Sequence, residues 1–328
     1  MQQLPDKHQY GRLPNRNIDV LAVGEVLIDL ISDTMQSSLS EAGTFTMYPG
    51  GQAANLAQNI AHLGGSVAMV TRVGDDSLGT LLRHHLQTSG VDTTYVRTTP
   101  HEPTTVAIIS RNTKTPDFTI YRGAEAHMIP DDMPTDLLPS IALVHTSAFA
   151  LAREPSRSTI AQFLKQAYEA SCLISFDPNY HPRLWESDPL TLLKTIYPYV
   201  FITKPSLDDC SRLFGEGLPP EEYISHFLAL GARNVVLTMG GDAVLVACDG
   251  QIHALPVHPV PVVDVTGAGD AFWSGLLLAI LDGYPVIDAA RVGQAIAALK
   301  IQQIGPITQA IERTEIYLQL GLQFPVMQ

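Results

Sequence analysis

The C-terminal third of the chain contains the stretch DVTGAGDAFWSGLLLAI, residues 264–280, in which small residues and one acid precede a long apolar run. The apolar run is typical of a buried helix, and the preceding VPVV, residues 260–263, predicts a strand. Gly267, Ala268 and Gly269 are therefore predicted to form a strand-to-helix turn whose backbone amides are open to a ligand. Because the first turn of a helix carries unpaired N–H groups and a partial positive charge, this turn predicts an anion hole.

Asp270 follows these small residues, and we expect it in the first helical turn, facing the same space. A carboxylate beside an anion hole can accept the proton of a hydroxyl group while the amides neutralise charge on a transferring phosphoryl group. An acid at this position also compensates the positive end of a helix. The spacing alone does not separate the two roles.

Short apolar runs alternate with helical patterns along most of the chain. The apolar runs, each typical of a buried strand, are residues 18–24, 66–74, 141–148, 172–177, 199–204, 234–240 and 243–248. The helical patterns, with apolar residues three or four positions apart, are residues 55–64, 77–90, 156–171 and 221–231. This alternation predicts an α/β fold with a doubly wound, mostly parallel sheet flanked by helices.

Two stretches depart from this alternation, residues 27–50 and about 98–124, because their strand-like segments have no helix between them. We expect them to form a small β lid over a cleft at the carboxyl edge of the main sheet, where ligands bind in open α/β folds. Residues 1–17 are polar and are interpreted as an N-terminal tail, followed by one domain over 18–328.

Composition narrows the class of protein. The 328 residues carry a formal net charge of −13 and contain no basic run, which argues against a nucleic-acid or anionic-membrane partner. The three cysteines are far apart in the sequence, as expected for free thiols in a reducing compartment. Without a long apolar segment or an apolar N-terminal leader, the sequence predicts a cytoplasmic protein.

Two further stretches carry residues suited to binding a small polar molecule. In YPGGQAANLAQNIAHLGG, residues 48–65, Gly50 and Gly51 allow close approach of the backbone to a ligand, and Asn55 projects from the start of a helix. In VGEVLIDL, Asp29 follows the first strand and can accept two hydroxyl groups. Taken singly, each is also compatible with an ordinary turn or a solvated acid.

Together, the three stretches resemble the ribokinase-like carbohydrate kinases of the PfkB family, from about residue 18 to 320, with fructokinases the nearest group. The resemblance implies transfer of the γ-phosphoryl group of ATP to a sugar hydroxyl. It implies Asp270 as the catalytic base and the amides of Gly267 to Gly269 as the anion hole. It also implies a lid from the two insertions and sugar contacts from a set of residues comprising Asp29, Gly50, Gly51 and Asn55.

The same resemblance implies a nucleotide site. VVLTMGG resembles the strand that binds nucleotide, which puts Thr238 and Gly240 near ATP. Gln294 stands where an Asn commonly lies near the adenine. Lys204 is the nearby cation in KPSLDDCSRLFG, and Ser206 takes the place of the usual Asn in that segment.

Two cation sites are implied as well. Asp209 replaces the Glu of the family's N-x-x-E segment, and we expect it to reach Mg²⁺ through water. Asp264 and Thr266, with backbone near Gly305, fall where many relatives hold a monovalent cation, so potassium is a further expectation.

The sugar is narrowed by FTIYRGAEA and FDPNYHPRLW, which resemble segments shared by fructokinases, 2-keto-3-deoxygluconate kinases and 5-dehydro-2-deoxygluconokinases. Arg122 is expected to point toward the substrate, or to lie on the lid surface, and Asp177 and Asn179 are expected beside the cleft. His181 stands where these relatives usually carry Arg, with Arg183 two residues later. Fructose is the expected substrate, on the argument that no extra Lys or Arg in the sequence indicates an acid sugar.

Three alternatives stay open: 2-keto-3-deoxygluconate as the substrate, another ketose or cyclitol, and a sugar-binding regulator without turnover, although such a regulator would be expected to lose Asp270. A Rossmann oxidoreductase is disfavoured because no G-x-G-x-x-G follows the first strand, and a P-loop kinase because no G-x-x-x-x-G-K-[ST] is present. The expected partners are a sugar and ATP, with a homodimer through the lid strands as a further hypothesis.

Overall fold

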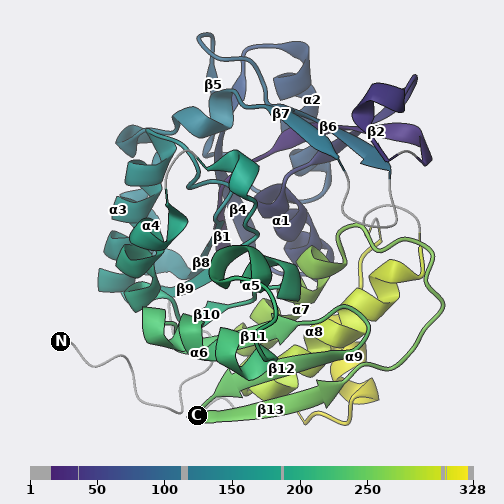
Figure 1. Cartoon of the computed structure of the whole chain (residues 1–328). Helices are drawn as coiled ribbons and strands as arrows, with labels where there is room; N and C mark the ends of the chain where they lie inside the picture. The colour runs from purple at the N-terminus through teal and green to yellow at the C-terminus, as the bar shows by residue number, and fades with distance from the viewer. Residues whose placement is uncertain are drawn as a thin grey trace.

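The computed structural model describes residues 16–35, 37–111, 117–185, 188–303, 307 and 309–323. Within these residues, nine strands form one sheet in the order β13-β12-β11-β10-β9-β8-β1-β4-β5 (Figure 1). All neighbours in it are parallel except β11–β12 and β12–β13. Its strands are β1 (Ile18–Val23), β4 (Val67–Gly74), β5 (Val96–Thr99), β8 (Ile141–Ser147), β9 (Leu173–Asp177), β10 (Ile202–Thr203), β11 (Asn234–Thr238), β12 (Ala243–Cys248) and β13 (Gln251–Pro256).

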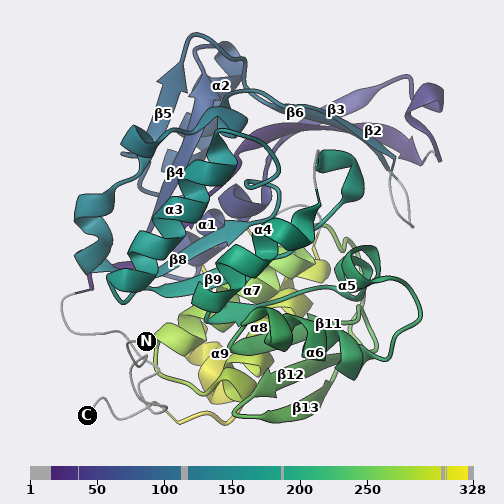
Figure 2. The same cartoon turned by 60° about the vertical axis from the view of Figure 1, so that its left-hand side comes forward.

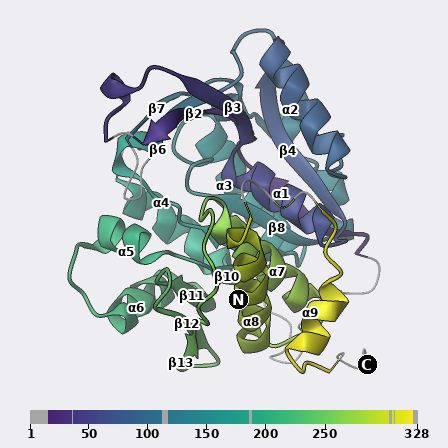
Figure 3. The same ribbon diagram turned by 90° about the vertical axis from the view of Figure 1, so that its right-hand side faces the viewer.

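Helices cover both faces of this sheet, and each face has its own apolar core. One face packs against α1 (Gln52–His62), α2 (Ser77–Thr88), α7 (Ala268–Leu281), α8 (Val286–Ile301) and α9 (Arg313–Gln319) (Figure 3). The other packs against α3 (Ser156–Glu169), α4 (Pro189–Ile196), α5 (Leu207–Phe214) and α6 (Pro220–Leu230). Strands buried on both faces read as unbroken apolar runs, which is why the sequence could identify them. The predicted doubly wound, mostly parallel sheet is confirmed.

The direction of winding reverses beside β1. From β1 the chain proceeds outward through β4 to β5, whereas β8, β9, β10 and β11 follow one another on the opposite side. In open α/β sheets ligands usually bind at the carboxyl ends of the strands beside such a reversal, which here lies between β1 and β8.

Four strands from the two helix-poor stretches form a separate sheet in the order β3-β2-β6-β7. They are β2 (Leu27–Met35), β3 (Phe45–Gly50), β6 (Val106–Arg111) and β7 (Phe118–Tyr121). Figure 2 shows this sheet projecting from the main body as a curved ribbon. Its small apolar cluster is centred on Leu27, Ala107 and Phe149, so one end of the sheet is seated on the chain that follows β8.

The structure corrects two local expectations. Residues 260–263 are not a strand. Pro259 and Pro261 lack the N–H groups that a ladder needs, and Val262 and Val263 are 62% and 55% exposed. Arg16, assigned to the N-terminal tail, is buried and donates hydrogen bonds to the carbonyls of Ile141 (2.7 Å) and Ala170 (2.8 Å).

The predicted strand at 199–204 is reduced to β10, Ile202–Thr203, because residues 197–199 form a 3₁₀ turn. Within the described residues, no helix is both long enough and apolar enough to cross a bilayer.

Candidate active site

Polar residues gather where the parallel strands of the main sheet end. Glu25 lies just beyond β1, Ser147 ends β8, Asp177 ends β9 and Lys204 follows β10. Ser147 Oγ donates to Glu25 Oε2 at 3.3 Å, so a hydrogen bond spans the point where the winding reverses. Of these, Glu25 and Ser147 were missed in the sequence, although Glu25 directly follows a strand ending in Gly.

Asp270 and Asn55, which are 215 positions apart in the sequence, meet in the fold. The amide Nδ2 of Asn55, on α1, donates to Oδ2 of Asp270, on α7, at 3.0 Å. Burial raises the pKa of Asp270 to about 7, and the neighbouring charges of Asp177 and Asp29 add to this effect, while the Asn55 bond and Lys204 oppose it. A carboxylate with a pKa near neutrality suits a general base, because it is ionised at working pH and still has appreciable proton affinity.

The start of α7 has the geometry of an anion site, with one difference from the expectation. Gly267 precedes the helix with φ of 75°, a left-handed conformation that favours glycine. The amide of Ala268 already donates to the carbonyl of Val265 at 3.1 Å. Within the described residues, the amides of Gly269 and Asp270 have no acceptor. By the same criterion the amide of Gly267 is open among the described residues, so of the three predicted donors Ala268 is the one already bonded, and the pair on α7, Gly269 and Asp270, extends the set.

Lys204 supplies a fixed positive charge beside these amides. Its side chain is buried, and a Cβ placed on Gly269 would lie 3.7 Å from its Nζ. The ammonium is paired with Asp177 Oδ2 at 3.7 Å and lies over the ring of Trp273. The pair of open amides and this ammonium can stabilise negative charge that develops on a transferring group.

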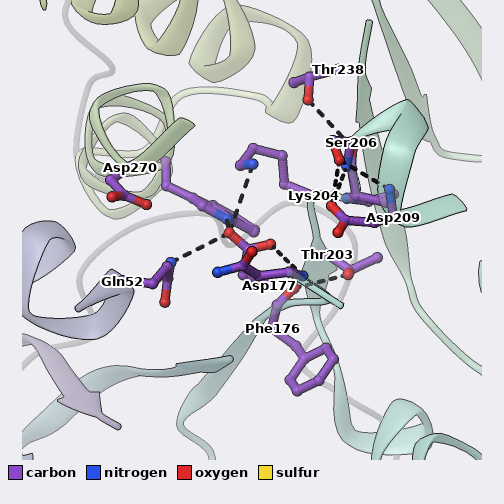
Figure 4. A network of polar contacts seen from close by, with 12 residues as sticks. Gln52, Phe176, Asp177, Thr203, Lys204, Ser206, Asp209, Thr238 and Asp270 are labelled. Carbon is purple, nitrogen blue, oxygen red and sulfur yellow. Dashed lines mark hydrogen bonds and ion pairs between the residues drawn. The ribbon is translucent and has the colours of Figure 1, made fainter. Parts of the chain in front are cut away.

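Asp177 is the centre of a buried network (Figure 4). Its Oδ2 accepts hydrogen bonds from Trp273 Nε1 at 2.8 Å and Gln52 Nε2 at 3.3 Å, in addition to the ion pair with Lys204. Gln52 also contacts Nε2 of the buried His145, and burial lowers the pKa of that imidazole to about 3. Burial raises the pKa of Asp177. Trp273, which packs in the apolar core, thus also orients Asp177.

Asp29 and the glycine pair lie against each other, as the sequence suggested. A Cβ placed on Gly50 would lie 2.0 Å from Asp29 Oδ2, so only glycine leaves room for this carboxylate. Gly51 has φ of 107° and precedes α1, and its own Cβ would meet the backbone of Glu25 at 2.5 Å. Burial raises the pKa of Asp29 to about 7.

Arg122 is not on the lid surface. Its side chain is 2% exposed and forms a bidentate ion pair with Glu125, whose side chain is 1% exposed. The Nε–Oε1 and Nη2–Oε2 distances are 2.6 and 2.7 Å. The guanidinium lies 4.1 Å from the ring centre of Phe149. Its remaining nitrogen, Nη1, is buried without a hydrogen-bond partner among the described residues. Such a buried donor can bond to water or to a bound ligand.

Arg122 lines a cavity of about 320 Å³ together with Arg153 and Arg183. The other lining residues are Phe118, Thr119 and Ile120 of β7, and Leu184. Arg183, two positions beyond His181, is 64% exposed and pairs with Asp117 at 3.2 Å. The sequence argument for fructose was that no extra Lys or Arg indicates an acid sugar. That argument is wrong, because three arginines from distant segments converge here.

The residues predicted near nucleotide have local partners. Ser206 begins α5 as its N-cap, and its amide donates to Asp209 Oδ2 at 2.9 Å. Thr238, at the end of β11, bridges to the same segment through the carbonyl of Pro205. Gly240 turns the chain toward β12 with φ of 59° and has open space beside it.

Asp209 does not fit a direct metal ligand. Besides Ser206, its other carboxylate oxygen accepts the amide of Tyr180 at 2.9 Å, and the side chain is buried. Within the described residues, no group of three or more His, Cys, Asp or Glu side chains could hold a metal ion. Asp209 instead joins α5 to the loop after β9.

Three other predicted residues lie near the cleft rim or behind it. Asn179 is exposed, and its backbone amide donates to Asp177 Oδ1 at 3.2 Å. Gln294, on α8, donates to the carbonyl of Pro256 at 3.1 Å. The amide of Thr266 donates to Asp264 Oδ1 at 2.9 Å, while Gly305 lies outside the described residues.

The chain is similar to known proteins over most of its length. Residues 17–313 match the model of the pfkB family carbohydrate kinases. The chain is 35% identical to an ATP-dependent 6-phosphofructokinase of Thermoanaerobacterium thermosaccharolyticum, over 89% of this chain and 91% of that protein. It is 32% identical to a fructokinase of Klebsiella pneumoniae, over 80% and 84% of the two chains.

Among solved structures, the Halothermothrix orenii fructokinase superposes with a TM-score of 0.76 and 33% identity, covering 88% of this chain and 100% of that one. The chain therefore belongs to the pfkB family of carbohydrate kinases and is an ATP-dependent sugar phosphotransferase.

Proposed function

We propose that this kinase phosphorylates a hydroxyl group of an anionic ketose, with fructose 6-phosphate the first candidate. The observation that carries the proposal is the cavity shared by Arg122, Arg153 and Arg183. Guanidinium groups bind phosphate and carboxylate through paired N–H donors, and Arg122 has one buried donor without an acceptor among the described residues. A neutral sugar has no anionic group to pair with the guanidinium groups that line this cavity.

A series of hydrogen bonds and longer-range electrostatic interactions links this cavity with the base. Asp270 accepts a hydrogen bond from Asn55, and α1, which carries Asn55, begins with Gln52, whose backbone amide donates to Glu25 Oε1 at 2.9 Å. The charges of Glu125 and Arg122 act on Glu25, whose pKa is raised to about 7, mainly by burial. A ketose that spans this series would present one end to Asp270 and its anionic group to Arg122.

The chemistry assigned to the chain's own residues follows from the geometry. Asp270, when ionised, accepts the proton of the attacking hydroxyl group as its oxygen bonds to the γ-phosphorus of ATP, while the bond from that phosphorus to the β,γ-bridging oxygen breaks and ADP leaves. The amides of Gly269 and Asp270 and the ammonium of Lys204 lie where negative charge on the transferring group needs stabilising. We expect Asp29 and Asn55 to orient the sugar, and Thr238, Gly240 and Gln294 to border the nucleotide. Mg²⁺ is expected to enter with the ATP phosphates as its main ligands.

Fructose itself remains the second candidate, because relatives at 32% and 33% identity are fructokinases. 2-Keto-3-deoxygluconate carries a carboxylate and is the third. The relative at 35% identity is a 6-phosphofructokinase, which supports the first.

Substrate choice is tested by measuring ADP release with each of these three sugars and with ribose. We expect fructose 6-phosphate to give the highest kcat/KM. In Arg153→Gln and Arg183→Gln, its KM should rise on the order of 10-fold, the scale of one lost charge-assisted hydrogen bond, with kcat retained. Arg97→Gln, at an exposed position on β5, is the matched control.

The sugar preference and its dependence on Arg153 and Arg183 together distinguish the three candidate substrates. A preference for 2-keto-3-deoxygluconate with the same arginine dependence would assign the cavity to a carboxylate. A preference for fructose, unaffected by either substitution, would overturn the proposal.

We also propose an assembly and a cellular location for the enzyme. Homodimerisation through the small sheet is supported by exposed apolar side chains on β3, namely Phe45, Met47 and Tyr48, and sedimentation of Met47→Glu against the wild-type chain would test it. A cytoplasmic location is supported by three buried free cysteines.

A further inference from the structure

The loop before α7 is hydrogen-bonded to the C-terminal end of α8, and Lys300 makes two of these bonds. Lys300, in the last turn of α8, is 2% exposed, and its Nζ donates to the backbone carbonyl of Asp264 at 3.0 Å and to Oδ2 at 3.2 Å. The other carboxylate oxygen accepts the amide of Thr266 at 2.9 Å. The amides of Val263 and Asp264 both donate to the carbonyl of Ile301, at 2.7 and 3.1 Å.

The ammonium of Lys300 lies directly behind the anion hole. A Cβ placed on Gly267, the residue just before α7, would be 3.9 Å from Lys300 Cε. The carboxyl end of α8 carries partial negative charge, which favours a cation there. A buried ammonium is costly unless paired, and Asp264 provides the paired charge. The position of Gly267, and with it the direction of the open amides, is thus tied to this ion pair.

Asp264 is also one of the residues at which the resemblance implied a monovalent cation. A potassium ion at Asp264 would compete for a carbonyl and a carboxylate oxygen that already bind a fixed charge of the same sign and magnitude. It would also lie beside the ammonium, with repulsion in a partly buried setting. The residues present therefore do not fit an added cation at this carboxylate.

We propose that the ammonium of Lys300 takes the place of a bound monovalent cation, so that the enzyme holds its anion-hole loop with a tethered charge and does not require potassium. Lys300 is then a positioning residue, acting through Asp264 and Gly267. The proposal rests on the kinase activity, and it is independent of which sugar is used.

The wild-type enzyme tests the proposal without any substitution. Its thermal unfolding and its kcat are compared in KCl, NH₄Cl and choline chloride at equal ionic strength. Because an ion that binds the native state raises Tm with its concentration, we expect Tm to agree within about 1 °C among the salts, and kcat within about twofold. A Tm that climbs with KCl but not with choline chloride, or a kcat that depends strongly on potassium, would overturn the proposal. The melting measurement needs no substrate, so it remains decisive if the sugar assignment fails.

Variants at position 300 supply the second arm. Lys300→Ala opens the space, and in choline chloride its kcat should fall on the order of 10-fold, less than the loss of an anion-hole donor itself. KCl or NH₄Cl should restore much of that loss and raise its Tm. Lys300→Met fills the volume without the charge, and its kcat should fall without being restored. Lys165→Ala, an exposed lysine on α3, is the control. Full activity of Lys300→Ala in choline chloride would contradict the proposal; if that variant does not fold, the wild-type measurements decide.

Discussion

The acidic and the basic ends of the proposed substrate site are built in different ways. The acidic end, with Asp270 and Asp177, stands on strand ends of the main sheet and on α7, and each carboxylate is held by side chains from other elements. The basic end, with Arg122, Arg153 and Arg183, is assembled from the edge strand β7 and two loops. With the roles proposed above, the catalytic groups stand on the rigid scaffold, whereas the groups that select the substrate stand on parts that can vary with little effect on the core.

The acidic end should be most sensitive to loss of the base. We expect Asp270→Asn to lower kcat by at least ~100-fold, the lower range for general-base catalysis, with the KM of the sugar little changed. Steady-state kinetics under saturating ATP measure this, and Asp136→Asn, at an exposed position, is the matched control. Near-normal turnover in Asp270→Asn would refute the assignment of the base.

The same variant separates function from stability. Because burial raises the pKa of Asp270 to about 7, above its unfolded value, the ionised form is disfavoured in the fold. The fold is penalised as pH rises from about 4 to 7, and the penalty is fully present above pH 7. Asp270→Asn should therefore melt roughly 2–4 °C higher than wild type at pH 8, with little difference at pH 4. A lower melting temperature at pH 8 would contradict the raised pKa.

At the basic end, the largest effect is expected on stability. Arg122→Leu leaves Glu125 buried without its partner, which should cost about 3 kcal/mol of unfolding free energy, measured by urea denaturation. Arg122→Leu combined with Glu125→Leu should recover most of that loss. Arg291→Leu removes an exposed pair with Asp288 and should cost under about 1 kcal/mol. Equal costs for the two single substitutions would show that the basic end is no more tightly built than the surface.

The smallest effect is expected from loss of the hydrogen bond between Asn55 and Asp270 at the acidic end. The Asn55 hydrogen bond lowers the pKa of Asp270, so Asn55→Ala should raise that pKa. Since the base must be ionised, the acidic limb of the kcat/KM profile should move to higher pH by about 0.5–1 unit, equivalent to about 0.7–1.4 kcal/mol. A limb that stays in place would mean that the profile reports another group, with Asp29 and Glu25 the nearest candidates.

The sequence predicted the architecture well because strands buried on both faces must be apolar throughout. It erred at residues 260–263, where valines suggested a strand but prolines prevent backbone pairing. The apolar pattern of residues 271–280 predicts that Trp273 is buried. It does not predict that its indole N–H donates to Asp177, which is 96 positions away in the sequence.

By itself, the sequence determined the sheet, the glycine turn before α7 and the identity of the acid in its first helical turn, because these depend on local composition and period. The tertiary structure alone decided which side chains meet: Asn55 with Asp270, Lys300 with Asp264, and three arginines around one cavity. Such encounters join residues tens to hundreds of positions apart, and their energies depend on distance and burial, which the order of residues along a chain does not specify.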